Sequence, residues 1–279
     1  MPSPGFENLS ADTLKQYINT QQEKDYMLID VRQPEEYAQA HIPGAKLIPL
    51  MELESRLVDL APDKDIVFYC RSGTRSRAAA LMAIGSPVAL KNIYNLAGGI
   101  MAWEGKTMAD SPQVKIFDGI QDPAELLLKS MDLEKGALRF YTHVVEKYAG
   151  QPFVHIMAPL VNAERIHAQS IFRYWEKIAE FPRPFDELFD NLKGDIMEGG
   201  EDLESVINRT ETIDNNPCLR LIELALDIEY SAYDLYRTMA DQTHDDKARN
   251  AFLAIAQAEK SHMQMLSNAV NQCAHLTAA

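Results

Sequence analysis

Two groups of side chains in this sequence have the types and spacing to carry out chemistry. One is a cysteine, Cys70, followed within six residues by hydroxyls, a glycine and two arginines. A thiolate is a good nucleophile, and neighbouring cations or backbone N–H groups lower the pKa of a thiol. The other group consists of four glutamates and two histidines between residues 134 and 262. Carboxylate oxygens and imidazole nitrogens are ligands that suit divalent iron or manganese.

The segment around Cys70 predicts an anion-binding loop. Asp65–Tyr69 is short, apolar and β-prone, and the alanine-rich stretch from Arg77 to Ile84 is typical of a helix. The loop between them therefore carries backbone N–H groups and precedes the positive end of a helix dipole. A buried structural cysteine is the alternative, because unpaired cysteines are commonly buried. The residues predicted to bind an anionic substrate are Arg71, Ser72, Gly73, Thr74, Arg75 and Ser76.

An oppositely charged pair stands at the end of another predicted strand. Asp30 and Arg32 lie at the end of the apolar segment Tyr26–Val31. In open α/β sheets, functional groups gather at the carboxyl ends of the strands. We therefore predict that both side chains contribute to substrate binding beside Cys70, with a structural ion pair as the alternative.

Helical spacing brings the glutamates and histidines together. Glu164 with His167, and Glu259 with His262, are Glu-x-x-His pairs, so each pair lies on one face of a helix. All of the glutamates interrupt apolar stripes, where a carboxylate is costly to bury unless something compensates its charge. Two divalent cations would neutralise four carboxylates, and we expect iron, with manganese or zinc as alternatives. The predicted metal ligands are Glu134, Glu164, His167, Glu229, Glu259 and His262.

The ligand positions recur at a constant offset. Residues 134, 164 and 167 reappear as 229, 259 and 262, each 95 residues later, and Tyr141 and Tyr236 share this offset. A single Glu-x-x-His pair is weak evidence, because such pairs are common on solvated helix faces. Two pairs with matched partner glutamates instead favour a dinuclear metal site inside a four-helix bundle.

These two groups require different frameworks. A polar segment at residues 104–123 divides the chain. Before it, strands alternate with helices, which predicts an α/β fold with a parallel sheet covered on both faces. Beyond it, four long helical patterns joined by a crossover predict an all-α four-helix bundle. The predicted strands are 26–31, 65–69 and 88–94, and the long helices are 123–148, 152–179, 218–241 and 245–272. The predicted domains are residues 1–110 and 122–279, with a linker at 111–121.

Composition narrows the classes of partner. The net charge of −14 is divided into −2 for residues 1–108 and −12 for the remainder, which argues against nucleic acid and anionic membranes. No apolar run has the length of a membrane helix and the N-terminus does not resemble a signal sequence, so we expect a cytoplasmic protein. The three cysteines are few and far apart, which suggests a reducing compartment without a disulfide framework. Cys218 and Cys273 are accordingly predicted to be structural or surface residues.

Five motifs of the first part resemble the rhodanese family. In family order within residues 6–108, they are residues 28–32, 34–37 and 41–45, the Cys70 loop, and residues 95–100 with Trp103. The resemblance implies sulfur transfer through a Cys70 persulfide, from thiosulfate or a persulfide to a thiol or cyanide acceptor. Four residues separate Cys70 from Arg75, whereas the phosphatases that resemble rhodaneses have five. The shorter loop favours sulfur transfer over phosphatase or arsenate reductase chemistry.

The second part resembles the di-iron domain of rubrerythrin. The resemblance spans residues 122–272 and rests on the six predicted ligands, with Phe140-Tyr141 and Leu235-Tyr236 following two of them. It implies a ferritin-like bundle and, by analogy with other such bundles, a homodimer. This sequence differs in two respects. It lacks the four cysteines of a rubredoxin centre, and Ala232 stands where rubrerythrin has a further glutamate.

The resemblances thus imply a rhodanese-like sulfurtransferase fused to a rubrerythrin-like di-iron domain, and an oxidase role, a peroxidase role or sulfur chemistry at the metal all stay open. Three alternatives remain open. The chain could be an iron-binding oxidative-stress protein whose rhodanese part is a sensor or docking module. The bundle could instead be a dimerisation device with a structural metal, or the Cys70 loop could belong to a phosphatase.

Overall fold

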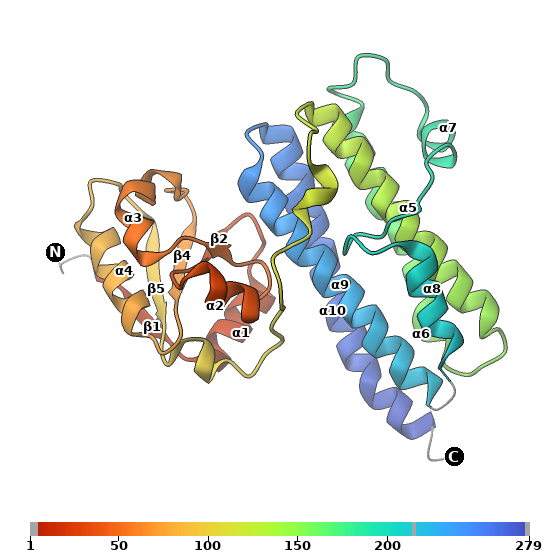
Figure 1. Cartoon of the computed structure of the whole chain (residues 1–279), viewed down its shortest axis with the longest axis horizontal. Coiled ribbons are helices and arrows are strands. Elements are labelled where there is room, and N and C mark those ends of the chain that lie inside the picture. The colour runs from red at the N-terminus through yellow and green to blue at the C-terminus, as the bar shows by residue number, and fades with distance from the viewer. Residues whose placement is uncertain (1–4, 214–215, 277–279) are drawn as a thin grey trace. The chain divides into compact units, whose positions relative to one another are not determined.

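The computed structural model describes residues 5–213 and 216–276. The chain divides into two compact units between Ser111 and Pro112 (Figure 1). The predicted linker, residues 111–121, contains a short 3₁₀ helix, η3 (Val114–Phe117), and the Phe117 side chain is buried in the helical core of the second unit.

The first unit is a five-stranded sheet in which every pair of neighbouring strands is parallel, in the order β1-β5-β4-β2-β3. This confirms the predicted α/β fold class. The strands are β1 (Glu7–Leu9), β2 (Tyr26–Asp30), β3 (Lys46–Leu47), β4 (Asp65–Tyr69) and β5 (Asn92–Leu96). The helices are α1 (Ala11–Thr20), α2 (Pro34–Gln39), α3 (Leu50–Arg56) and α4 (Thr74–Gly85), with 3₁₀ turns at Leu57–Asp59 (η1) and Gly99–Ala102 (η2).

Alternation along the central strands builds a hydrophobic core on each face of the sheet. Ile66 and Phe68 of β4 join one core with residues of α3 and α4, whereas Val67 and Tyr69 join the other with residues of α1 and α2. Both central strands are buried along their whole length, as expected for a parallel sheet covered by helices on both sides. The sheet therefore fixes the strand end that carries Cys70.

In the first unit, several elements differ from the prediction. The strand predicted for residues 88–94 begins at Asn92, where pairing with the first residue of β4, Asp65, begins, and it extends to Leu96. The helix predicted from Arg77 starts at Thr74, one turn closer to the cysteine. The short strands β1 and β3 pair at the two edges of the sheet and are too brief to give a periodic signal.

The second unit is helical, and this confirms the predicted all-α second half. Two long hairpins, α5 with α6 and α9 with α10, pack together and are joined by a crossover that carries two short helices (Figure 1). The helices are α5 (Pro123–Lys147), α6 (Val154–Trp175), α7 (Phe185–Asp190), α8 (Leu203–Glu211), α9 (Pro217–Gln242) and α10 (Asp246–Leu276).

A polar layer divides the core of this bundle. One apolar cluster includes Met131, Ile171 and Phe252, and the other includes Leu160 and Leu266. The predicted ligand positions lie between these clusters along each of the four long helices, and the glutamates among them are at most 1% exposed. Apolar packing at both ends thus holds the polar layer away from water.

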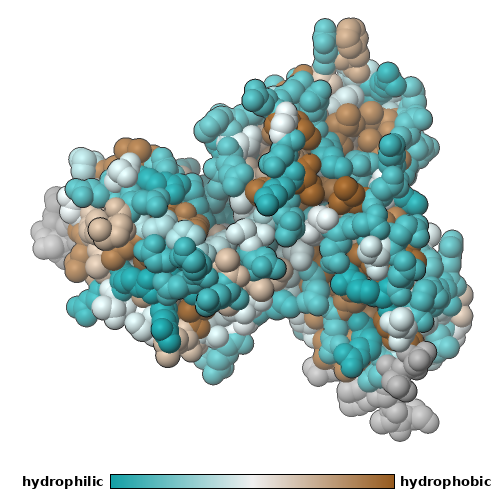
Figure 2. Space-filling model, viewed as in Figure 1, coloured by the Kyte–Doolittle hydropathy of each residue, from teal (hydrophilic) through white to brown (hydrophobic). Residues whose placement is uncertain are grey.

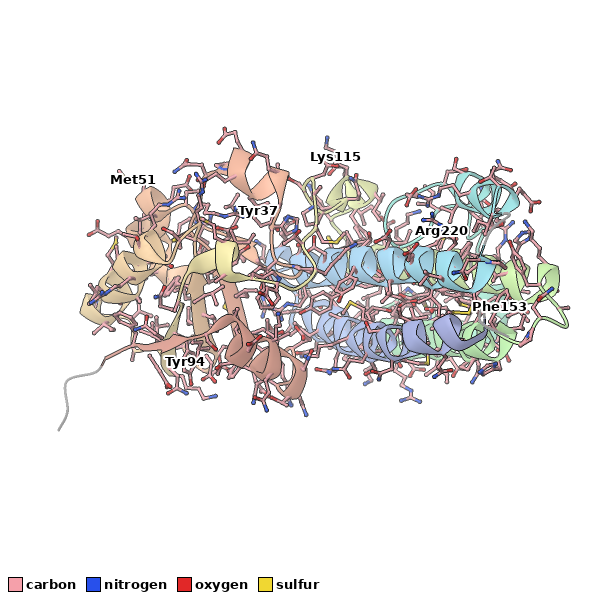
Figure 3. The ribbon with its side chains drawn as sticks, turned by 90° about the horizontal axis from the view of Figure 1, so that it is seen from below. Tyr37, Met51, Tyr94, Lys115, Phe153 and Arg220 are labelled. Carbon is pink, nitrogen blue, oxygen red and sulfur yellow. A yellow bond between two sulfur atoms is a disulfide. The ribbon has the colours of Figure 1, made fainter. Side chains whose placement is uncertain are left out.

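The two remaining cysteines are structural residues, but the prediction of a chain without disulfides was wrong. Cys218 and Cys273 form a disulfide with their Cα atoms 5.5 Å apart (Figure 3). They are 55 residues apart in the sequence, but antiparallel packing brings the start of α9 beside the end of α10. The cysteine content therefore no longer argues for a reducing compartment.

Hydrophilic residues cover most of the face drawn in Figure 2. Large exposed hydrophobic side chains do occur, among them Phe181 in the crossover at 76% exposure. Within the described parts of the chain, no helix combines the length and hydrophobicity that crossing a bilayer requires.

Candidate functional site

The sulfur of Cys70 lies at the centre of the loop between β4 and α4. The backbone N–H of Gly73 donates to Cys70 Sγ at 3.1 Å, and the Ser76 hydroxyl donates at 3.4 Å. Burial by itself raises the pKa of the thiol. The hydrogen bonds from the Ser76 hydroxyl and from loop N–H groups outweigh it, so the pKa of Cys70 is lowered. The loop therefore favours a thiolate.

A glycine turn under this loop keeps its N–H groups directed at the sulfur. Ile100 N–H donates to the Cys70 carbonyl at 2.8 Å and Met101 N–H donates to the Arg71 carbonyl at 3.1 Å. The carbonyls of Cys70 and Arg71 therefore point toward the glycine turn and not toward Sγ. A Cβ on Gly99 would lie 2.3 Å from the Cys70 carbonyl oxygen, so this close approach requires glycine.

Access to Cys70 is restricted, because the residue is only 1% exposed. Arg71, Ser72 and Thr74 are exposed around it, whereas Gly73 and Ser76 are buried. Burial alone would also fit a structural cysteine, which the sequence left as an alternative. Two directed donors on the sulfur are not needed for packing, and they favour the nucleophile.

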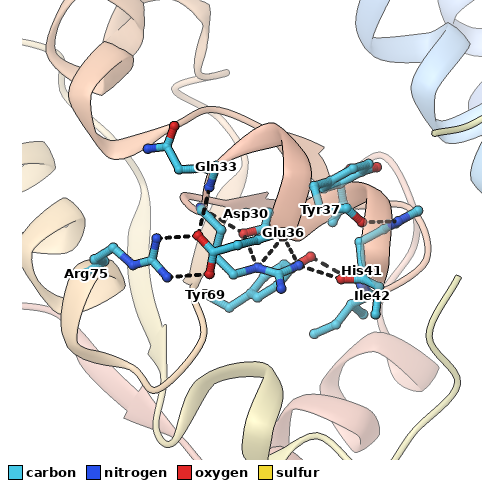
Figure 4. A network of polar contacts seen from close by, with 11 residues as sticks. Asp30, Gln33, Glu36, Tyr37, His41, Ile42, Tyr69 and Arg75 are labelled. Atoms are coloured by element: carbon cyan, nitrogen blue, oxygen red, sulfur yellow. Dashed lines mark hydrogen bonds and ion pairs between the residues drawn. The ribbon is translucent and has the colours of Figure 1, made fainter. Parts of the chain in front are cut away.

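Arg75 is already paired. Its guanidinium donates to both carboxylate oxygens of Glu36 at 2.7 Å (Figure 4), and this pairing lowers the pKa of Glu36 to about 2. Glu36 belongs to the Pro-Glu-Glu-Tyr motif that opens α2, and its contact with the Cys70 loop was not predicted. Arg75 therefore contributes less net positive charge to the loop than its type suggests.

Asp30 and Arg32 form a buried ion pair (Figure 4). The Arg32 guanidinium donates to Asp30 Oδ2 at 2.6 Å and to the Ala40 carbonyl at 2.6 Å. Arg32 also lies over the ring of Tyr69, the residue before Cys70. These contacts support the structural alternative, in which the pair fixes the end of β2, and a direct role in binding substrate stays a prediction.

The lowered pKa of Cys70 predicts a pH profile. We expect the rate of alkylation by a small reagent to rise with pH and to level off at a lower pH than for an unstructured cysteine, because the thiolate persists below the usual pKa. Ser76→Ala, which removes one donor, should move the midpoint upward. Alkylation rates measured across the pH range test this, and a wild-type midpoint at or above that of a free cysteine would contradict it.

The second unit brings all six predicted metal ligands into one buried layer. His167 Nδ1 lies 3.3 Å from Glu134 Oε2, 3.2 Å from Glu164 Oε2 and 2.9 Å from Glu259 Oε1. His262 Nδ1 lies 3.0 Å from Glu229 Oε2, 3.4 Å from Glu259 Oε2 and 3.8 Å from Glu164 Oε1. Two positions result, one beside each imidazole.

These distances divide the four glutamates into two pairs, which would be bridging and terminal ligands if two cations were bound. Glu164 and Glu259 each direct one oxygen toward His167 and the other toward His262, as carboxylates that bridge two cations would. Glu134 lies beside His167 alone and Glu229 beside His262 alone. The geometry therefore fits two cations that share two carboxylates.

Two buried tyrosines hold the terminal glutamates. Tyr236 donates to Glu134 Oε1 and Tyr141 donates to Glu229 Oε1, both at 2.5 Å. The other oxygen of each glutamate is the one that lies toward an imidazole. Since burial raises the pKa of both phenols, the tyrosines remain donors and fix the carboxylates in place.

Unsatisfied polar atoms show that the layer fits cations. Among the described residues, both oxygens of Glu164 and Glu259, Glu134 Oε2 and His167 Nδ1 have no hydrogen-bond partner. A buried charge costs several kcal/mol, while a hydrogen bond to a charged group returns about 1.5–3 kcal/mol. Two tyrosines and at most two imidazolium charges therefore leave two of the four carboxylates uncompensated, whereas two divalent cations neutralise all four. Without cations, burial raises the pKa of Glu164 to about 7.

The structure adds a carboxylate that the sequence analysis missed. Glu198, in the crossover between α7 and α8, is 1% exposed. One of its oxygens lies within 4.8 Å of oxygens of Glu134, Glu164 and Glu259. No periodic pattern covers this segment, and its only sequence signal is a glutamate set between a methionine and two glycines.

Comparisons with known families match both units. The sequence model of the Rhodanese-like domain matches residues 10–106, and that of Rubrerythrin matches residues 125–270. The first match contains Cys70 and its loop, and the second contains the polar layer of the bundle.

Curated relatives align with only about a third of this chain, a length close to that of the Rhodanese-like match. A protein of Allochromatium vinosum named sulfurtransferase is 42% identical over 82 residues, which are 29% of this chain and 73% of the relative. A Bacillus subtilis protein named "Putative sulfurtransferase YtwF" is 38% identical over 102 residues, 37% of this chain and 94% of the relative. Coverage is lower for other B. subtilis relatives, 51% of YrkF and 64% of YqhL. Among solved structures, a rhodanese-related protein of Thermoplasma volcanium is 30% identical with a TM-score of 0.33, covering 38% of this chain and all of the other.

Proposed function

Because the chain belongs to the rubrerythrin family and carries a rhodanese-like domain ahead of that match, we propose that it is a sulfurtransferase fused to a di-iron carboxylate domain. Relatives named as sulfurtransferases support the first half. The observation that carries it is the pair of donors on Cys70 Sγ, from Gly73 and Ser76.

The proposed reaction has two steps at Cys70. The thiolate attacks the outer sulfur of thiosulfate, the S–S bond of thiosulfate breaks, and sulfite leaves with the electron pair. A thiolate or cyanide then attacks the outer sulfur of the Cys70 persulfide, which releases a new persulfide or thiocyanate and restores the Cys70 thiolate. Loop N–H groups and the exposed Arg71 stabilise the anionic donor and the departing sulfite. A small-molecule persulfide can replace thiosulfate as donor in the same scheme.

In the second unit, the six glutamates and histidines of the polar layer would hold two iron ions, with manganese or zinc as alternatives. When bound, such ions supply one-electron redox chemistry toward oxygen, peroxide or sulfur species. The protein orients the terminal carboxylates through Tyr141 and Tyr236. The apolar clusters on both sides keep water out of the layer. The proposal includes a homodimer, by analogy with other ferritin-like bundles, and a cytoplasmic location.

Steady-state kinetics test the sulfurtransferase. With thiosulfate and cyanide as varied substrates, a persulfide intermediate gives parallel lines in double-reciprocal plots. Converging lines, which indicate that both substrates must bind together, would contradict the two-step reaction. Turnover of an aryl phosphate without turnover of thiosulfate would support the phosphatase alternative.

A second candidate function is that of an iron-binding oxidative-stress protein in which the rhodanese-like domain acts as a sensor. The match to Rubrerythrin over residues 125–270 favours it, because a metal centre in the bundle could carry out such a function without turnover at Cys70. Metal-dependent consumption of oxygen or peroxide that Cys70→Ser leaves unchanged, without thiosulfate turnover, would support this function over sulfur transfer.

A further inference from the structure

Glu198 lies at the tip of a small hairpin in the crossover. Ile196 forms an antiparallel bridge with Asp202, and Gly200 N–H donates to the Met197 carbonyl at 2.8 Å, which closes a turn over Glu198. The tip of a turn is normally exposed to solvent. Glu198 is instead 1% exposed, and its Oε1 finds no hydrogen-bond partner among the described residues. The hairpin therefore directs a charged side chain inward.

Polar side chains of α5 bind the crossover just before the hairpin. Asp132 Oδ1 accepts from Lys193 N–H at 2.9 Å and from Gly194 N–H at 2.8 Å. Two turns further along α5, Arg139 donates to the carbonyls of the same two residues at 2.8 and 2.9 Å. These contacts hold both the N–H and the carbonyl groups of Lys193 and Gly194. They therefore fix how far the hairpin that follows inserts into the bundle.

The helices on both sides of the hairpin are shaped to accept it. A Cβ on Gly136 of α5 would lie 2.4 Å from the Ile196 carbonyl oxygen. A Cβ on Gly199 would lie 3.0 Å from Cβ of Ser231 on α9. Gly136 and Ser231 each follow a terminal glutamate of the metal layer by two residues, so the hairpin enters between α5 and α9 at the level of that layer.

The geometry points to Glu198 as a metal ligand that serves the position beside His167, and this inference rests on the dinuclear centre proposed above. Its oxygen lies within 4.8 Å of oxygens of Glu134, Glu164 and Glu259. Two oxygens on opposite sides of one metal ion lie about 4.2 Å apart, so a small contraction brings all four into bonding distance. Glu229, the terminal glutamate of the other position, is not in this group.

Glu198 makes the two metal positions unequal. The other six ligands form three pairs related by the 95-residue offset. Glu198 has no such partner, because the residue 95 positions before it is Trp103, which belongs to the first unit. The position beside His167 thus receives a carboxylate for which the position beside His262 has no counterpart in the repeat. We expect the His167 position to bind its ion more tightly and to fill first, and the His262 position to keep more room for a small exogenous ligand.

Titration of the metal-free full-length chain with Co²⁺ tests this, with bound metal measured after each addition. Wild type should bind two ions with different affinities. Glu198→Gln keeps the side-chain shape but replaces a carboxylate oxygen by an amide, and the tighter affinity should fall by about tenfold or more. Glu201→Gln is the matched control, because Glu201 is exposed in the same hairpin and pairs with Arg209; it should bind both ions as wild type does.

A double-mutant comparison assigns the position. On a His167→Ala background, Glu198→Gln should add little to the loss of affinity, since both changes affect one ion. On a His262→Ala background it should add its full loss. Two ions bound by Glu198→Gln with wild-type affinities and an unchanged Co²⁺ absorption spectrum would overturn the assignment of Glu198. Absence of metal binding by wild type would instead overturn the proposed dinuclear centre.

Discussion

Cys70→Ser should reduce sulfur transfer from thiosulfate by about a thousandfold or more, because removal of a covalent nucleophile eliminates the intermediate itself. A serine hydroxyl fits the same space but is not ionised near neutral pH. The donors on Cys70 Sγ and the lowered pKa of the thiol indicate that this is where an ionised sulfur is stabilised. Initial rates of thiocyanate formation measure the effect.

The other two cysteines provide the control. Cys218 and Cys273 are bonded to each other in the helical unit, so replacing both by serine should leave the rate of sulfur transfer unchanged while lowering the resistance of that unit to unfolding. If the double variant lost the activity and Cys70→Ser retained it, the sulfur would be carried in the bundle and not at the end of β4.

Glu164→Ala should abolish binding of both metal ions, whereas Glu229→Ala should leave one ion bound. The reason is geometric. Glu164 directs its two oxygens toward different imidazoles, while Glu229 gives one oxygen to His262 and the other to Tyr141. Elemental analysis of the dialysed variants, expressed as ions per chain, measures the difference.

An exposed glutamate two turns earlier on α9, Glu223, offers a matched control, and Glu223→Ala should retain both ions. Thermal unfolding separates loss of ligands from loss of structure. Bound metal should raise the unfolding temperature of wild type and of Glu223→Ala but not that of Glu164→Ala, because only a protein that binds the ions is stabilised by them. Two ions per chain in Glu164→Ala would show that this carboxylate does not bridge.

Side-chain periodicity was sufficient to anticipate the polar layer. The glutamates recur on helix faces that are otherwise apolar, and a helix turns such spacing into a shared direction. The end of β4 was also predictable, because its short apolar and β-prone run stops at Tyr69, where the strand ends and the loop begins. In both places the local secondary structure follows from the sequence. The functional side chains are therefore brought together once the helices or strands that carry them pack.

The crossover and the loop partners could not be predicted in this way. Glu198 is placed by contacts of its hairpin with α5 and α9, and Glu36 is placed by the packing of α2 beside the Cys70 loop. Irregular segments show no hydrophobic periodicity from which a side-chain direction could be predicted. Contacts between residues far apart in the sequence depend on how the helices and strands pack. The sequence therefore could not show that Arg75 is neutralised or that a further carboxylate enters the bundle.

The disulfide is a different case, since its signal was available. In an antiparallel helix pair, residues that lie opposite each other have numbers with a constant sum. Glu229 and His262, which contact each other, add to 491, and so do Cys218 and Cys273. The register implied by the predicted ligands thus places the two cysteines side by side.

Native mass spectrometry of the full-length chain after incubation with thiosulfate tests the central claim most directly. We predict a chain that carries two metal ions and one additional sulfur atom, and the same two ions without the sulfur in Cys70→Ser. A wild-type chain without metal ions, or additional sulfur on Cys70→Ser, would contradict the account.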